Sequence, residues 1–106
     1  MESIVVFVTC ASKKEAERLG KVVVRKRLAA CANVVASPVK SIYRWKGKVE
    51  TTVEVLMLIK TTRGKFRALE TEIRRLHSYD TPEIIALPIA AGSKAYLEWL
   101  RQSVKM

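Results

Sequence analysis

The chain has 106 residues, of which 49% are hydrophobic and 28% charged, and its formal net charge is +10 at pH 7. These values are typical of one globular domain, so residues 1–106 are taken as a single domain. No run of 18 apolar residues exists, which excludes a transmembrane helix. Met1-Glu2-Ser3 also lacks the basic region that opens a signal peptide. We therefore expect a complete, cytoplasmic chain that does not associate with membranes.

The first third of the chain predicts a strand, a helix and a second strand. Ile4 to Thr9 is apolar on both faces, as expected of a central strand. Ser12 and Glu15 have the spacing of a capping box, in which Ser12 accepts from the helix start and Glu15 reaches back. The helix runs to about Ala29, and strand character resumes from Ala30 to Val35.

A long hairpin follows. Pro38 interrupts the second strand because proline removes a ladder donor, and Val39 to Trp45 continues that strand as the first arm. Gly47 can supply the positive φ that a tight turn at Lys46-Gly47 needs. The second arm returns from Lys48 to Lys60.

This second arm is apolar on both faces. Val53, Val55, Met57 and Ile59 point one way, and Leu56 and Leu58 point the other. In one small domain, helices cover only one side of such a sheet. The face that carries Leu56 and Leu58 therefore needs other cover, which predicts a partner subunit.

The last third predicts a helix, a strand and a final helix. The first of these helices has one buried stripe, formed by Phe66, Leu69, Ile73 and Leu76. It ends near His77, and the strand runs from Glu83 to Ile89. Ser93 is the expected cap of the final helix.

The element order βαββαβ, followed by a C-terminal helix, predicts the ferredoxin-like arrangement of the α+β class. In this arrangement an antiparallel sheet carries both main helices on one face. A long hairpin joins the second and third strands. The uncovered face favours an oligomer that stacks or extends its sheets.

The basic residues fall into three groups, which are Lys13 to Arg27, Lys40 to Lys48 and Lys60 to Arg75. Clustered cations are typical of nucleic-acid binding. The alternative is a solvated, ion-paired surface, supported by helical spacings that allow Glu17 to pair with Lys21 and Glu70 with Arg74. No nucleic-acid-binding motif accompanies the charge, so nucleic acid is not the expected partner.

Cys10 and Cys31 are the only cysteines. Their spacing is not that of a zinc or thioredoxin-type site. A free cysteine in or beside a strand is most often a small buried hydrophobic residue, and this is what we expect of both.

Five segments together resemble one known family. They are Arg27 to Asn33, Ser41 to Glu50, Ile59 to Thr62, His77 to Ile84, and Tyr96 to Leu100. In matching order, these segments look like CutA, the divalent-cation tolerance family. The resemblance implies a cytosolic homotrimer of ferredoxin-like subunits, similar in architecture to the PII signalling proteins. It also implies an association with tolerance of copper and other divalent metals.

The chain departs from the family at its metal-binding positions. Ser78 replaces the proline that usually follows the histidine. Some members have a cysteine in the first strand and a second histidine, proposed as copper ligands, where this chain has Val8 and Leu76. The resemblance therefore does not carry over an intact copper site.

For a metal, the candidate ligands are His77, the only histidine, and Cys31. Asp80 and Glu83 assist only if the fold or a neighbouring subunit brings them close. The alternative role of His77 is to cap the C-terminus of its helix. No cofactor is required on this interpretation, and weak binding of Cu(II) or another divalent cation is expected.

For a small molecule, the candidate residues are Trp45, Lys60, Tyr79 and Glu83. Lys60 ends a strand and Glu83 starts one, so we expect both at one rim of the sheet, where a Lys–Glu pair with aromatic walls suits an anionic or zwitterionic ligand. Alternatively, Lys60 and Glu83 pair across subunits, and Trp45 and Tyr79 seal the interface.

No catalytic motif is present, so an enzyme is not expected. The sequence favours a trimeric, cytosolic protein of divalent-cation (copper) tolerance that binds metal weakly. The alternative is a PII-like small-molecule sensor, or an enzyme, that uses the cleft between subunits.

Overall fold

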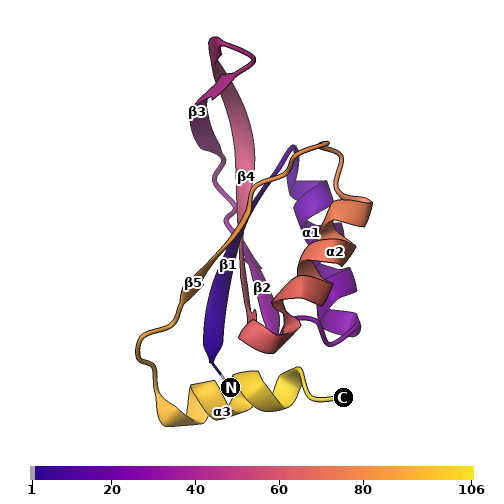
Figure 1. Cartoon of the computed structure of the whole chain (residues 1–106), viewed down its shortest axis with the longest axis vertical. Helices are drawn as coiled ribbons and strands as arrows, with labels where there is room; N and C mark the ends of the chain where they lie inside the picture. Colours follow the sequence, from indigo (N-terminus) through magenta and orange to yellow (C-terminus); the bar gives the residue numbers. More distant parts are fainter. Residues whose placement is uncertain (1) are drawn as a thin grey trace.

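Five strands form one antiparallel sheet in the computed structural model, which describes residues 2–106 (Figure 1). The elements are β1 (Ser3–Cys10), α1 (Lys13–Arg25), β2 (Cys31–Val34), β3 (Val39–Trp45), β4 (Lys48–Thr62), a 3-10 turn (Arg63–Lys65), α2 (Phe66–Leu76), β5 (Ile84–Pro88) and α3 (Lys94–Ser103). The spatial order is β2-β4-β1-β5, and β3 pairs with the remaining part of β4. The predicted ferredoxin-like order is confirmed, with β2 and β3 as the two halves of one interrupted strand.

Strand β4 is the longest strand and pairs with three others, β1, β2 and β3. Its C-terminal half pairs with β1 on one side and β2 on the other, and its N-terminal half pairs with β3 alone. The N-terminal half of β4 and its partner β3 project from the body of the subunit as a two-stranded arm (Figure 1). Lys46 (φ 49°) and Gly47 (φ 80°) form its tip, and two successive positive φ values are the signature of a type I′ turn.

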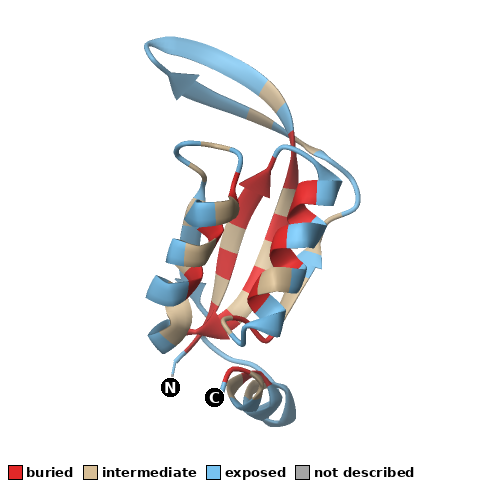
Figure 2. Cartoon of the chain, turned by 90° about the vertical axis from the view of Figure 1, so that its right-hand side faces the viewer, coloured by how far each residue is buried: buried red, intermediate tan, exposed pale blue. Residues whose placement is uncertain are grey.

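The core lies between the sheet and helices α1 and α2, which cover one face (Figure 2). Its fully buried side chains include Val6, Val8, Met57 and Ile59 from the sheet and Leu19, Val23, Leu69 and Ile73 from the helices. Helix α3 lies across the lower end of the sheet, where Leu100 and Val104 pack against Ala30 (Figure 1).

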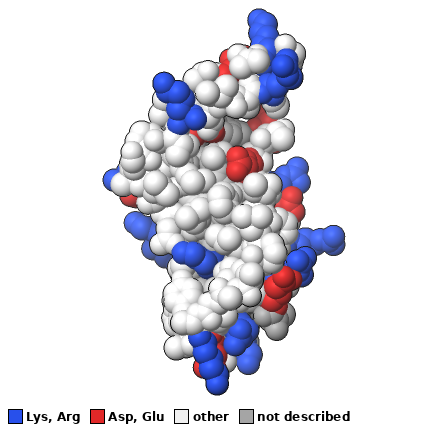
Figure 3. Space-filling model, turned by 90° about the vertical axis from the view of Figure 1, so that its left-hand side faces the viewer, with Lys and Arg blue, Asp and Glu red and all other residues white. Residues whose placement is uncertain are grey.

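The opposite face of the sheet is apolar and has no helical layer. Leu56 and Leu58 are only half-buried, and Ile85 and Leu87 on β5 are 53% and 50% exposed. Figure 3 shows that the middle of this face is largely free of charged atoms. As predicted, helices cover one face of the sheet in the subunit, and the other face is left uncovered.

Helix α1 ends at Arg25, four residues before the predicted end at Ala29. Arg27 takes a positive φ of 57°, and the N–H groups of Arg27 and Leu28 donate to the carbonyls of Val24 and Val23. This is a Schellman motif, whose left-handed position is usually glycine. The sequence predicted a longer helix because apolar residues continue past Arg25 and because Arg27 stands where glycine would have marked the helix end.

Replacing Arg27 with glycine should raise the free energy of unfolding by roughly 1 kcal/mol, because the left-handed conformation strains a residue that has a Cβ. Guanidinium denaturation at a fixed protein concentration measures the change. The matched variant Arg25→Gly lies inside the helix and should lower stability by about 1 kcal/mol. An equal loss of unfolding free energy in both variants would contradict a left-handed conformation at Arg27.

Candidate functional site

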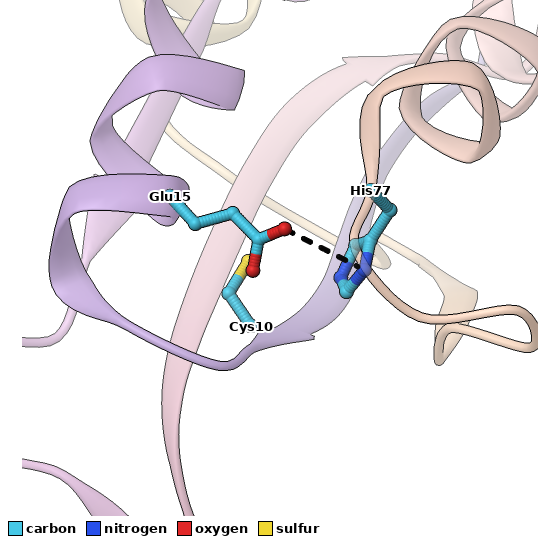
Figure 4. A group of neighbouring side chains, drawn as sticks. All are labelled: Cys10, Glu15 and His77. Atoms are coloured by element: carbon cyan, nitrogen blue, oxygen red, sulfur yellow. Dashed lines mark ion pairs between the residues drawn. The ribbon is translucent and has the colours of Figure 1, made fainter.

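A buried polar cluster lies where β1 ends, α1 begins and α2 ends. It consists of Cys10, Glu15 and His77, whose candidate ligand atoms all lie within 4.8 Å of one another (Figure 4). The sequence predicts His77 as a metal ligand but does not indicate that it lies beside Cys10 or Glu15. The grouping depends on three separate elements meeting, which no spacing along the chain reveals.

Both carboxylate oxygens of Glu15 accept backbone hydrogen bonds. Oε1 accepts from the N–H of Ala11 (3.1 Å) and Oε2 from the N–H of Ser78 (2.8 Å). Burial alone raises the pKa of the Glu15 carboxyl, but the hydrogen bonds from Ser78 and Ala11, together with His77, outweigh it and hold the pKa below its usual value. Glu15 therefore joins the start of α1 to the loop after α2.

Both ring nitrogens of His77 are occupied as well. Nε2 lies 2.8 Å from the carbonyl oxygen of Thr9, and Nδ1 accepts the N–H of Tyr79 at 3.0 Å. A carbonyl only accepts, so these partners select the neutral tautomer with the proton on Nε2. Oε2 of Glu15 approaches Nδ1 at 3.9 Å, the dashed line of Figure 4. His77 thus ties the end of β1 to the loop that follows α2.

Cys10 completes the cluster as a neutral thiol. Burial, followed by the charges of Glu15 and Glu54, raises its pKa to about 12. Thiolate, carboxylate and imidazole suit a transition metal in chemical type. However, a metal here must displace the thiol proton and compete with hydrogen bonds that hold the fold. The residues match a metal by donor type but are not preorganised for one.

Cys31 is not part of this cluster. It pairs with Lys60 near the C-terminal end of β4, whereas Cys10 pairs with Val55 in the middle of that strand, five residues or about 17 Å away. Its Sγ lies 3.7 Å from the hydroxyl oxygen of Tyr96 on α3. The structure therefore does not bring His77 and Cys31 together within one subunit. Cys10 is buried as expected, and Cys31 is only partly so.

A cavity of about 650 Å³ opens beside the cluster, between the hairpin and the loop after α2. Three of the four predicted cleft residues line it, namely Trp45, Tyr79 and Glu83. The other lining residues are Thr9, Ser41, Ile42, Tyr43, Thr52, Glu54, Asp80 and Thr81. The lining contains aromatic rings and three carboxylates but no Lys or Arg, although the chain is strongly basic.

Glu54 is the buried carboxylate among the lining residues that the sequence did not indicate. Only 8% of it is exposed, and its Oε2 accepts the hydroxyl of Tyr79 at 2.9 Å. Burial and this carboxylate raise the pKa of Tyr79 well above its usual value, so the phenol stays protonated as a donor. A carboxylate in the middle of a largely apolar strand was the available signal.

Lys60 lies away from the cavity, contrary to the expectation that it shares a rim with Glu83. Both β4 and β5 are antiparallel to β1, so they run parallel to each other. The C-terminal end of β4 and the N-terminal end of β5 are therefore at opposite ends of the sheet. Lys60 instead donates a hydrogen bond to the side-chain oxygen of Asn33.

The chain is similar in sequence and in structure to known proteins of one family. Residues 4–103 match the family model described as CutA1 divalent ion tolerance protein. The chain belongs to the CutA1 family. The chloroplastic CutA 1 of Oryza sativa is 45% identical over 97% of the chain, and the chain spans only 58% of that protein. The CutA divalent-cation tolerance protein of Thermus thermophilus is 46% identical over 93% of the chain and 95% of its own length.

Among solved CutA structures, the protein of Archaeoglobus fulgidus superposes with a TM-score of 0.93 at 40% identity, covering 97% of this chain and 99% of that one. The Archaeoglobus protein is named as periplasmic, and the rice relative is named as chloroplastic. In residues 2–106 of this CutA1-family chain, no helix has the length and apolarity needed to cross a membrane. The Thermus thermophilus relative is named as a divalent-cation tolerance protein.

Glu15→Gln should lower the free energy of unfolding by roughly 2 kcal/mol at pH 7, because the amide places an N–H₂ group against a backbone donor. The lowered pKa means that wild-type Glu15 stabilises the fold above about pH 4.3 and loses this effect as acid protonates it. The difference between the two proteins should therefore shrink below that pH.

Denaturant unfolding from pH 3 to pH 7 measures this difference. The matched control is Glu17→Gln, an exposed residue of the same helix, which should change stability by less than about 0.5 kcal/mol. A difference independent of pH would show that Glu15 acts by packing and not by charge.

Proposed function

We propose that this protein is a homotrimer that acts in divalent-cation (copper) tolerance in the cytoplasm, binds the cation weakly and catalyses no reaction. Membership of the CutA1 family supports the tolerance role. The observation that carries the metal-binding part is the Cys10, Glu15 and His77 cluster. Its donor types suit a transition metal, and its internal hydrogen bonds limit the affinity.

The uncovered sheet face supports the assembly. Ile85 and Leu87 are about half exposed on it, and Leu56 and Leu58 are half-buried. Large apolar side chains that lie together on one face mark an interaction surface, and burying them between copies of the chain removes them from water. The number of three subunits rests on the family resemblance.

Wild-type protein should therefore give one species of three subunit masses in light scattering at micromolar concentration. Leu87→Lys should shift it to the mass of one subunit, because the interface would bury three unpaired ammonium groups. Val24→Lys is the matched control, since Val24 is 39% exposed but lies on α1, on the other side of the sheet. A monomeric wild-type protein, or dissociation by Val24→Lys alone, would refute this interface.

Weak metal binding follows from the chemistry of the cluster. The Cys10 thiol has a pKa of about 12, so binding of a metal to sulfur releases a proton at neutral pH. Each oxygen of Glu15 and each nitrogen of His77 already has a hydrogen-bond partner. The free energy of forming the metal bonds is offset by the loss of these contacts.

Titration with Co(II) tests this site, because thiolate coordination gives Co(II) a charge-transfer absorption and avoids the oxidation of thiols by Cu(II). The apparent affinity should rise about 100-fold from pH 6.5 to pH 8.5, if one proton is released for each metal bound. Cys10→Ala should abolish the absorption. The matched variant Cys31→Ala should leave it unchanged, since Cys31 pairs with β4 five residues away from the partner of Cys10.

Loss of binding in Cys31→Ala alone would instead support the sequence-based ligand pair of His77 and Cys31. If no divalent cation binds in a saturable way, direct metal binding fails, and the tolerance role then requires an indirect route.

The aromatic, acidic cavity favours a second candidate function, a small-molecule sensor. Its volume of about 650 Å³ is typical of ligand sites. The carboxylates of Glu54, Asp80 and Glu83 and the ring of Trp45 favour a cationic ligand over the anionic or zwitterionic ligand expected with Lys60 in the cleft. An enzyme in this cleft has less support, since the sequence carries no known catalytic motif. Trp45→Ala should lower the affinity of the cavity for such a ligand, whereas Cys31→Ala should leave the affinity unchanged.

A further inference from the structure

The positive charge of the chain is concentrated on one layer of the molecule. Residues 13–27 and 63–75, which contain helices α1 and α2, hold twelve Lys or Arg against four Glu, a net +8 of the total +10. These two groups are separate in sequence and come together because both helices cover the same face of the sheet (Figure 2). The opposite face is largely uncharged at its centre (Figure 3).

Few of these cations are neutralised within the subunit. The predicted pairs Glu17–Lys21 and Glu70–Arg74 do not form among residues 2–106. Of the twelve cations, only Lys26 (2.6 Å) and Arg75 (3.0 Å), which share Glu72, and Arg63, which pairs with Glu2, form ion pairs among residues 2–106. The interpretation of the charge as an ion-paired surface therefore loses its main support.

Four of the cations form a stripe along α1, made of Lys14, Arg18, Lys21 and Arg25. Their spacings of four, three and four residues place them on one side of the helix, within an arc of about 60°. All four are exposed, and they lie opposite Leu19 and Val23, which are buried. Neighbouring members are about 5–6 Å apart, and the stripe is roughly 16 Å long.

We propose that the outer surface of helices α1 and α2, with this stripe at its centre, binds the phosphate backbone of duplex nucleic acid without sequence preference. Evenly spaced, solvated cations are what phosphate neutralisation needs. Base reading would require side chains that enter a groove, and no recognition element is present on this layer.

A protein partner fits this surface less well. Stable protein interfaces have a core depleted of charge and anchored by large apolar side chains. The stripe contains only Lys and Arg, and Val24 beside it is small. The surface also lies on the opposite side of the sheet from the apolar face, so it remains accessible when that face is covered. The proposal therefore does not depend on the metal-binding function.

Fluorescence anisotropy with a labelled 20-base-pair duplex, titrated at several KCl concentrations, tests the proposal. The logarithm of the association constant should fall linearly with the logarithm of the salt concentration. The double variant Lys14→Gln/Lys21→Gln should reduce the magnitude of this slope by about 1.8 and weaken binding on the order of 100-fold at 50 mM salt. A second duplex of unrelated sequence should bind equally well.

The matched control is Lys94→Gln/Lys105→Gln, which removes the same charge from exposed positions on α3 and near the C-terminus. It should bind like the wild type within a few-fold, and circular dichroism should show that both variants are folded. An equal loss in the control would mean that total charge and not this surface drives binding, and would overturn the proposal. So would failure to bind duplex at 50 mM salt, including the case in which phosphatidylserine vesicles bind instead.

Discussion

The fifteen residues of β4 are the constraint on which the rest of the structure depends. They pair with β1, β2 and β3, so one register sets which residues face the helices and which end of the sheet each neighbour reaches. Because α1 and α2 cover a single face, the alternate residues of the strand remain uncovered. The same strand thus provides the core, the projecting arm and the apolar surface that supports assembly.

At the upper end of the sheet, the fold and the candidate metal chemistry use the same atoms. Glu15 and His77 join β1, α1 and the loop after α2 through short hydrogen bonds, and they are also the donors nearest to Cys10. A donor that already has a protein partner is a poor metal ligand, because coordination must replace that contact. This competition explains why a cluster of suitable type is consistent with weak metal binding.

The surface of the subunit is divided into three regions of different chemistry. The helix layer is strongly basic, the cavity beside the hairpin is acidic and aromatic, and the sheet face opposite the helices is apolar. A chain with a net charge of +10 would repel its own copies, so an interface made from the uncharged face keeps the basic layers apart. The acidic cavity then stands out as the place where a cation is attracted.

The sequence by itself determined the elements, because caps, turns and apolar periodicity act over a few residues. Ser12 and Ser93 accept the predicted capping bonds, and Gly47 takes the predicted positive φ. Only the tertiary structure decided which side chains meet, since that depends on register and strand direction. It grouped Cys10 with Glu15 and His77 and separated Lys60 from Glu83, although both adjoin strand ends in the sequence.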